Sequence, residues 1–161
     1  RNREKSMEEQ MMREAIRLAL ENVELGRGGP FGAVLVKDGE IIGAGTNRVV
    51  ADNDPTAHAE VIAIRAACQR LDTFQLDDCE LYVTCEPCPM CLCAAYWARI
   101  PALYYACTRS DAQHYGFDDE RFYREMCRGP HEREIRTTQM LRDEALRVFR
   151  LWEEDPDKMP Y

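Results

Sequence analysis

The 161-residue sequence contains no apolar run that approaches the roughly 20 residues needed for a membrane-spanning helix. Its first six residues, Arg-Asn-Arg-Glu-Lys-Ser, are polar and lack the apolar stretch of a secretory signal. Together these absences predict a cytoplasmic protein without a membrane anchor. The sequence leaves open whether residues 1–6 belong to the natural chain, because Met7 could also be its start.

The chain also lacks an excess of positive charge. It carries 21 Lys and Arg residues against 29 Asp and Glu residues, which gives a net charge of −8. Attraction to phosphates supplies essentially all non-specific nucleic-acid binding, so this balance argues against a nucleic-acid partner. It favours a small uncharged substrate instead, although a local basic patch would be compatible with it.

No internal repeat, low-complexity tract or proline-rich linker interrupts the sequence. Its length therefore fits a single domain over residues 1–161, with a core large enough to enclose a site. Eight cysteines in a chain without a secretory signal favour free thiols in a reducing compartment. Four of them are expected to be small buried apolar residues: Cys68, Cys79, Cys107 and Cys127.

The first part of the chain has the pattern of a helix followed by a hairpin. Apolar residues recur at helical spacing from Met12 to Val23, and Gly26 follows as a plausible C-cap. Two apolar segments, 31–36 and 41–46, then flank Asp38 and Gly39. This pair tolerates the positive φ angles of a type I′ turn, which predicts an antiparallel hairpin.

The rest of the chain alternates between helical and strand patterns. A helix is expected from His58, a strand at 81–84, a helix opened by Pro87 and a strand at 103–107. Strand, helix and strand in this order imply a right-handed crossover, and hence an α/β fold with a mixed sheet covered by helices. A last helix is expected from Leu141 to Trp152, followed by an extended C-terminal arm over 153–161.

Two short motifs, each at the start of a predicted helix, have the residue types of a zinc site. The first contains His58 and the second contains Cys88 and Cys91. The Cys-x-x-Cys spacing lets two sulfurs share one tetrahedral ion, and the imidazole would be a third ligand. Three protein ligands leave the fourth position to water, as in catalytic zinc sites, where the water pKa falls toward about 7.

Glu60 follows His58 by two residues and is expected to face the water as a proton carrier, a role that contributes about 10²–10⁴ in rate. A second Cys-x-x-Cys, from Cys85 to Cys88, overlaps the first. Cys85 ends the preceding strand, whereas Cys88 and Cys91 share the helix entrance, so we assign the latter two to the metal. His-x-Glu combined with Pro-Cys-x-x-Cys is the signature of zinc deaminases that act on nucleobases.

Further segments carry a wider resemblance: residues 28–34 (Gly-Gly-Pro-Phe-Gly-Ala-Val), 53–60, 85–91, 96–99 (Tyr-Trp-Ala-Arg), 116–119 (Gly-Phe-Asp-Asp) and the terminal Tyr161. Over nearly its whole length the chain resembles the cytidine deaminase-like superfamily and, within it, the bacterial-type guanine deaminases. The resemblance implies a three-layer α/β/α fold. It also implies attack at C2 of guanine, which yields xanthine and ammonia.

The resemblance further implies roles for individual residues. Phe31 would pack on the purine face and Asn47 would hydrogen-bond the purine edge. Asp119 and Tyr161 would complete recognition, in a homodimer whose subunits exchange their C-terminal segments. The residue types alone also allow simpler roles, with Phe31 in the core, Asn47 as a turn or cap residue and Asp119 as a helix cap.

Three alternatives remain open at the level of sequence. Cys93 and Ala95 replace the Gly and larger aliphatic residue that are usual in the family, so guanosine, an aminopterin-like ring or another aminated azine is an alternative substrate. A tRNA adenosine deaminase would share the zinc motif, but it would be expected to have a basic C-terminal helix, and this one is rich in Glu and Asp. A purely structural zinc module would need a fourth ligand, for which Cys85 is the nearby candidate.

Overall fold

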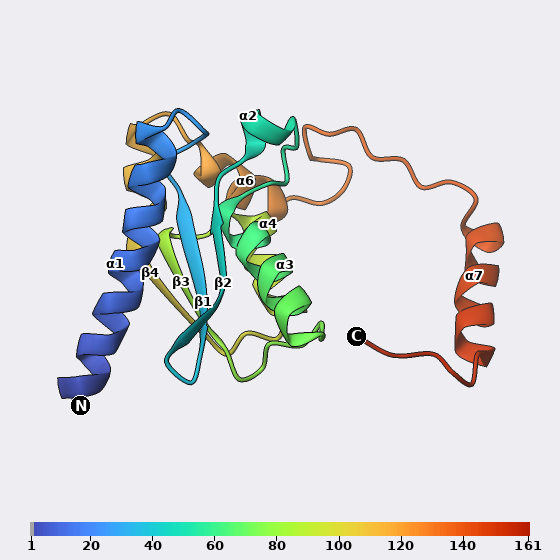
Figure 1. The fold of residues 1–161 in the computed structure, drawn as a ribbon. Helices are drawn as coiled ribbons and strands as arrows, with labels where there is room; N and C mark the ends of the chain where they lie inside the picture. The colour runs from blue at the N-terminus through green and yellow to red at the C-terminus, as the bar shows by residue number, and fades with distance from the viewer. Residues whose placement is uncertain (1) are drawn as a thin grey trace. The chain divides into compact units, whose positions relative to one another are not determined.

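The computed structural model describes the backbone of residues 2–161 and the side chains of residues 6–161. Two compact units are distinguished, Arg1–Phe122 and Tyr123–Tyr161. The elements follow in the order α1 (Asn2–Glu24), β1 (Gly32–Lys37), β2 (Glu40–Thr46), α2 (Val49–Asp52), α3 (Ala59–Leu71), β3 (Glu80–Cys85), α4 (Pro89–Trp97), β4 (Ala102–Cys107), α5 (Arg109–His114), α6 (Asp119–Met126) and α7 (Arg142–Glu154) (Figure 1).

The strands form one mixed sheet in the order β2-β1-β3-β4. β1 pairs antiparallel with β2 and with β3, and β3 pairs parallel with β4. Asp38 and Gly39 join β1 to β2 and both have positive φ, 51° and 78°, which confirms the predicted turn. The crossover through α4 between parallel strands is also confirmed.

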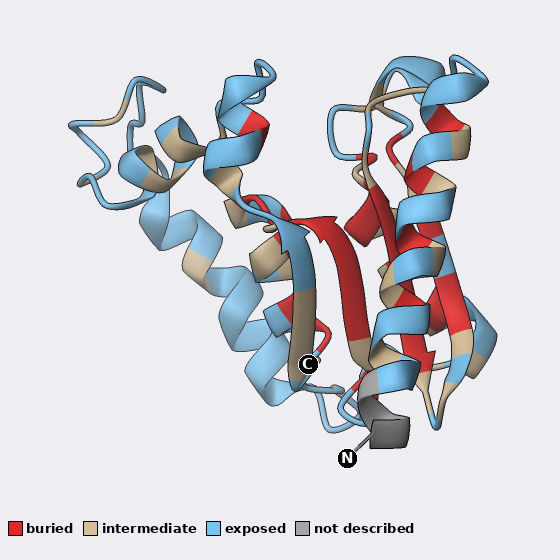
Figure 2. Ribbon diagram, turned by 90° about the vertical axis from the view of Figure 1, so that its left-hand side faces the viewer, coloured by how far each residue is buried: buried red, intermediate tan, exposed pale blue. Residues whose placement is uncertain are grey.

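Helices cover both faces of the sheet, as the continuous burial along β1 and β3 requires, because successive side chains of a strand point to opposite faces. Val34, Val36 and Tyr82 pack with α1 in one core cluster. Their neighbours in sequence pack against α3 and α4 in a second cluster, which includes Ala33, Leu35, Leu81 and Val83. Figure 2 shows the buried residues concentrated on the strands and on the helix faces beside them. This is the predicted three-layer α/β/α architecture.

Close packing of a glycine in β2 places the start of α3 directly on the sheet. A Cβ atom at Gly45 would lie 2.2 Å from the carbonyl oxygen of Ala59, the first residue of α3. No side chain fits in that space, so the backbone of β2 touches the backbone of the helix. The residues that flank Ala59, His58 and Glu60, are therefore held at a fixed depth against the sheet.

Several expected boundaries need correction. The helix expected from the pattern between Met12 and Val23 begins earlier, at Asn2, so it includes the polar residues 2–6, while Arg1 lies outside the described residues. α4 begins at Pro89 and not at Pro87. Four cysteines were expected to be buried. Cys79 is buried as expected, but Cys68 is half-buried, and Cys107 and Cys127 are exposed.

The second unit contains α7, which occupies nearly the range expected for the last helix. Residues 155–161 after it form neither helix nor strand. Among the helices that the structure describes, none is long and apolar enough to cross a membrane.

Candidate metal centre and active site

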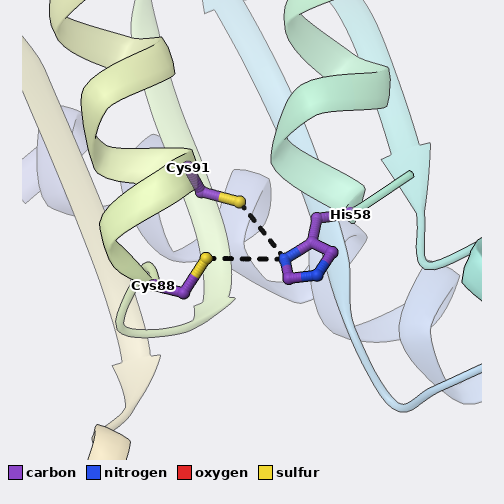
Figure 3. A group of neighbouring side chains, drawn as sticks. All are labelled: His58, Cys88 and Cys91. Atoms are coloured by element: carbon purple, nitrogen blue, oxygen red, sulfur yellow. Dashed lines mark hydrogen bonds between the residues drawn. The ribbon is translucent and has the colours of Figure 1, made fainter. Parts of the chain in front are cut away.

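Two helix starts bring three potential metal ligands together. His58 is the N-cap of α3, Cys88 is the N-cap of α4 and Cys91 lies in the first turn of α4. The Nδ1 atom of His58 lies 3.4 Å from the Sγ atom of Cys91 and 3.6 Å from that of Cys88 (Figure 3). All three donor atoms lie within 4.8 Å of one another. Neither N-cap side chain caps its own helix, so both are available to a ligand.

These separations fit zinc. Tetrahedral zinc with bonds of about 2.3 Å to sulfur and about 2.0–2.1 Å to nitrogen separates such ligand atoms by about 3.6 Å. Two sulfurs and one imidazole are also the ligand types that zinc prefers. The residues present therefore fit a three-ligand zinc site, and the described residues include this one such cluster of His, Cys, Asp and Glu side chains.

The electrostatics of the cluster favour thiolate. The pKa of Cys88 is lowered, chiefly because the Cys91 thiol hydrogen-bonds to it and also because His58 does. The pKa of His58 is raised, mainly by its hydrogen bond to Cys88. Unpaired N–H groups of a helix start stabilise negative charge at the same place. Zinc binding would therefore replace protons that the three side chains share.

Cys85 takes no part in this cluster. It is the last residue of β3, and its Sγ atom lies 3.6 Å from the carbonyl oxygen of Thr108. Burial raises the pKa of its thiol to about 12. Because its sulfur is turned toward this carbonyl and is not one of the three clustered donor atoms, Cys85 does not complete a closed structural site.

Glu60 lies in the first turn of α3 and is buried, with 9% of its surface exposed. Burial raises the pKa of its carboxyl group, and Cys91 contacts it through a side-chain hydrogen bond. A buried carboxyl beside the metal cluster, with an elevated pKa, is suited to accept and return a proton. Glu60 is not one of the three clustered ligands.

A cavity of about 410 Å³ opens beside the cluster, within the range of about 300–1,000 Å³ typical of small-molecule sites. It lies within the first unit. Its lining brings together side chains from the ends of several elements, including Phe31, Asn47, His58, Glu60, Phe117 and Asp119. Three of the four residues expected to bind a purine therefore share one cavity with the expected catalytic residue.

Phe31 and Asn47 form one wall of this cavity. The ring of Phe31 packs edge-on against Phe117, with centroids 4.8 Å apart and planes at 84°. The Oδ1 atom of Asn47 accepts a hydrogen bond of 3.2 Å from the backbone N–H of Val49 at the start of α2. Of the two simpler roles considered for Asn47, this contact is the turn role, since Arg48 is the N-cap of α2, and it orients the amide so that its NH₂ group is left for another acceptor.

Asp119 reaches the cavity because its neighbour caps the helix. The Oδ1 atom of Asp118 accepts from the backbone N–H of Arg121 at 3.3 Å, while Asp119 lines the cavity at the first residue of α6. Burial raises the pKa of the Asp119 carboxyl group. Tyr161 belongs to the second unit, whose placement relative to the cavity is not determined.

Sequence reasoning assigned no role to Glu86 and Arg109. Glu86 lines the cavity and accepts from the backbone N–H of Arg109 at 3.0 Å. The Nε atom of Arg109 also lies 3.1 Å from Glu120, the residue after Asp119. Thr108 and Asp111 form a capping box at the start of α5, and this S/T-x-x-D signal in the sequence could have located the helix that carries Arg109.

Comparison with known proteins agrees with this geometry. Residues 5–107 match the family described as the cytidine and deoxycytidylate deaminase zinc-binding region. The chain is 52% identical to guanine deaminase of Bacillus subtilis (strain 168) over 95% of its own length and 98% of the relative. The crystal structure of that enzyme superposes with a TM-score of 0.92 over the same shares of both chains.

Other relatives match over less of the chain. A tRNA-specific adenosine deaminase of Aquifex aeolicus is 52% identical over 48% of this chain and 51% of the relative. The structure of guanine deaminase from Nitrosomonas europaea is 36% identical, with a TM-score of 0.65, over 68% of this chain and 63% of that one.

Proposed function

The chain belongs to the family of the cytidine and deoxycytidylate deaminase zinc-binding region and is a zinc-dependent aminohydrolase, and we propose that its substrate is guanine. Water replaces the 2-amino group, so guanine and water yield xanthine and ammonia. The observation that carries this proposal is the 52% identity to a guanine deaminase across nearly the full length of both chains.

The proposed reaction needs two functions, activation of water by the metal and proton transfer by Glu60. His58, Cys88 and Cys91 would hold a zinc ion, which would supply Lewis-acid activation of water, whose pKa falls to about 7 at such sites. The Glu60 carboxylate takes a proton from the attacking water and delivers one to the departing amine, which leaves as ammonia. Burial of Glu60 helps this exchange because a raised pKa makes the carboxylate a stronger base.

The cavity wall supports recognition of a purine that has both acceptors and N–H donors on its edges. Phe31 offers an aromatic face to the ring. The NH₂ group of Asn47 donates to a ring acceptor, since its Oδ1 atom is already occupied by Val49. Asp119 accepts from ring N–H groups, and Tyr161 completes the site. Guanine presents acceptors at O6 and N7, which suits the Asn47 amide.

The test is ammonia release from a panel of substrates: guanine, guanosine, a 2-aminopterin and a tRNA anticodon arm. Guanine is expected to be turned over fastest. The tRNA-specific adenosine deaminase of Aquifex aeolicus matches 48% of this chain, against 95% for the guanine deaminase of Bacillus subtilis, and the net charge of −8 disfavours a polyanion. Faster turnover of the anticodon arm, with a steep dependence on salt, would assign the chain to tRNA instead.

The proposal also covers the oligomeric state of the protein and the cellular compartment in which it acts. Residues 1–161 act as one deaminase domain, and two copies form a homodimer in which the C-terminal arm of each chain closes the site of the other. Pro156 and Pro160 stiffen the arm, and Tyr161 ends it with an aromatic group suited to packing. All eight cysteines are free, which supports a reducing, cytoplasmic compartment and a role in purine metabolism.

A further inference from the structure

One buried amide lies behind the base-binding wall. Asn22, in the last turn of α1, has only 2% of its surface exposed. Its Nδ2 atom donates to the backbone carbonyl oxygen of Gly29 at 2.9 Å and to that of Asn47 at 3.0 Å. Both protons of the amide NH₂ group are therefore used, and each goes to a different segment of the chain.

The two segments joined by Asn22 are those that carry the wall of the cavity. Gly29 and Asn47 both line it, and the loop that contains Gly29 leads directly into Phe31. The backbone N–H of Asn47 also donates to the carbonyl oxygen of Phe31 at 3.2 Å. A single side chain on α1 thus ties the glycine loop to the end of β2 at the point where the two present their cavity residues.

The loop at Gly28 packs closely enough against Asn47 that loss of the Asn22 amide would alter the position of both. A Cβ atom at Gly28 would lie 2.2 Å from the carbonyl oxygen of Asn47 and 3.2 Å from the Nδ2 atom of Asn22. The loop backbone therefore packs directly on Asn47, without intervening side chains. If the two hydrogen bonds were lost, the loop and Asn47 would be free to separate, which would shift Phe31 relative to the amide of Asn47.

We infer that Asn22 is a positioning residue for the base-binding pair Phe31 and Asn47. This inference rests on the proposed function, because it assigns the pair to substrate binding. The metal cluster and Glu60 are held by α3 and α4, to which Asn22 makes no hydrogen bond that the structure records. Loss of the Asn22 amide should therefore weaken binding of the ring while leaving the chemical step intact.

Asn22→Asp is the sharpest variant, because it keeps the shape of the side chain and replaces the donor NH₂ group with an acceptor facing two carbonyl oxygens. Two lost hydrogen bonds predict that KM for guanine rises about tenfold or more while kcat stays within about twofold. The inhibition constant of xanthine should rise by a similar factor. Asn22→Ala, which removes the donor without adding charge, should show the same pattern if the Asp variant does not fold.

Tyr82→Phe is the matched control. Tyr82 is also 2% exposed and donates a hydrogen bond, of 2.7 Å, to Glu80, but it belongs to the core cluster beside α1 and lines no part of the active-site cavity. Its loss should lower the melting temperature without changing KM. Zinc content and thermal unfolding are measured for all variants alongside the kinetics.

A residue that only stabilises the fold would give a different result. Asn22→Asp and Asn22→Ala would then behave like Tyr82→Phe, with a lower melting temperature and unchanged KM, or neither would fold. Either outcome overturns the inference, and so does a loss of kcat with unchanged KM. If the parental protein does not convert guanine, the proposed function fails first, before any variant of Asn22 is compared.

Discussion

The Nδ1 atom of His58 lies 3.4 Å from the Sγ atom of Cys91, although 33 residues separate them in the chain. The contact exists because α3 and α4 both begin at the same end of the sheet, one after β2 and one after β3. Each helix start contributes ligands and a partial positive charge. The candidate active site is therefore a consequence of where two helices begin, and substitutions at those positions should separate metal binding from proton transfer.

Serine variants should distinguish Cys88, a proposed zinc ligand, from the nearby Cys85, which is not expected to bind zinc. Cys88→Ser is expected to lose both zinc and activity, because serine replaces a thiolate ligand. Cys85→Ser is expected to retain zinc and most of the activity, since Cys85 faces the carbonyl of Thr108 and not the cluster. Metal analysis and guanine turnover measured on the same samples test this. The reverse pattern would show that Cys85 is the ligand.

Replacement of Glu60, the proposed proton carrier, should lower the rate of the reaction without removing the metal. Glu60→Gln keeps the size of the side chain and removes its basicity, so kcat should fall by about 10²–10⁴. Zinc content should remain that of the parental protein, because Glu60 is not in the ligand cluster. A variant that loses zinc along with activity would instead place Glu60 among the ligands.

The buried carboxyl group should also affect the stability of the metal-free protein in a pH-dependent way. Burial raises the pKa of Glu60 in the folded state above 4.5, its ordinary value. The raised pKa means that the folded protein favours the protonated carboxyl group. Its contribution to the free energy of unfolding is therefore fully present below the unfolded-state pKa, and it is lost as pH rises through the folded-state pKa. After chelation, Glu60→Gln should therefore be more stable than the parental protein at pH 8.

This advantage of Glu60→Gln should shrink as the pH is lowered toward 4.5, the ordinary pKa of the carboxyl group. Denaturant unfolding of both chelated proteins across the pH range measures the difference directly. An advantage that is constant with pH, or that grows on acidification, would contradict a raised pKa of Glu60.

Deletion of residues 157–161 tests the C-terminal arm. If the arm closes the active site, kcat/KM for guanine should fall by about tenfold or more, because closure excludes water and positions the ring. The melting temperature should change little, and a sizing measurement before and after deletion tests whether the proposed dimer forms and depends on the arm. Parental kcat and KM in the truncated protein would remove Tyr161 from the site.

The sequence was sufficient to locate the metal site but not the start of α4. Two prolines flank Cys88, and either could occupy the first turn of a helix. The residue before a proline avoids the helical region, and Cys88 precedes Pro89. Cys88 accordingly has φ −66° and ψ 165°, which makes it the N-cap and moves the helix start to Pro89. The Cys88-Pro89 pair in the sequence is therefore the signal that places the start of α4 at Pro89.

Other features depend on contacts that no local pattern reports. Asn22 and Asn47 are 25 residues apart, and only the packing of α1 beside the glycine loop joins them. Cys107 is exposed because β4 is an edge strand of the sheet, and strand order follows from long-range pairing. The hairpin at Asp38 and Gly39 could be predicted, in contrast, because its turn chemistry lies within two residues.

The central claim, that this chain deaminates guanine with one zinc ion held by His58, Cys88 and Cys91, is tested most directly by a titration. Protein stripped of metal by a chelator receives increasing zinc while xanthine and ammonia formed from guanine are measured together. Activity should rise in proportion to bound zinc and level off at one equivalent per chain, with one ammonia for each xanthine. Full activity in the stripped protein, or no xanthine at one bound equivalent of zinc, would contradict the account.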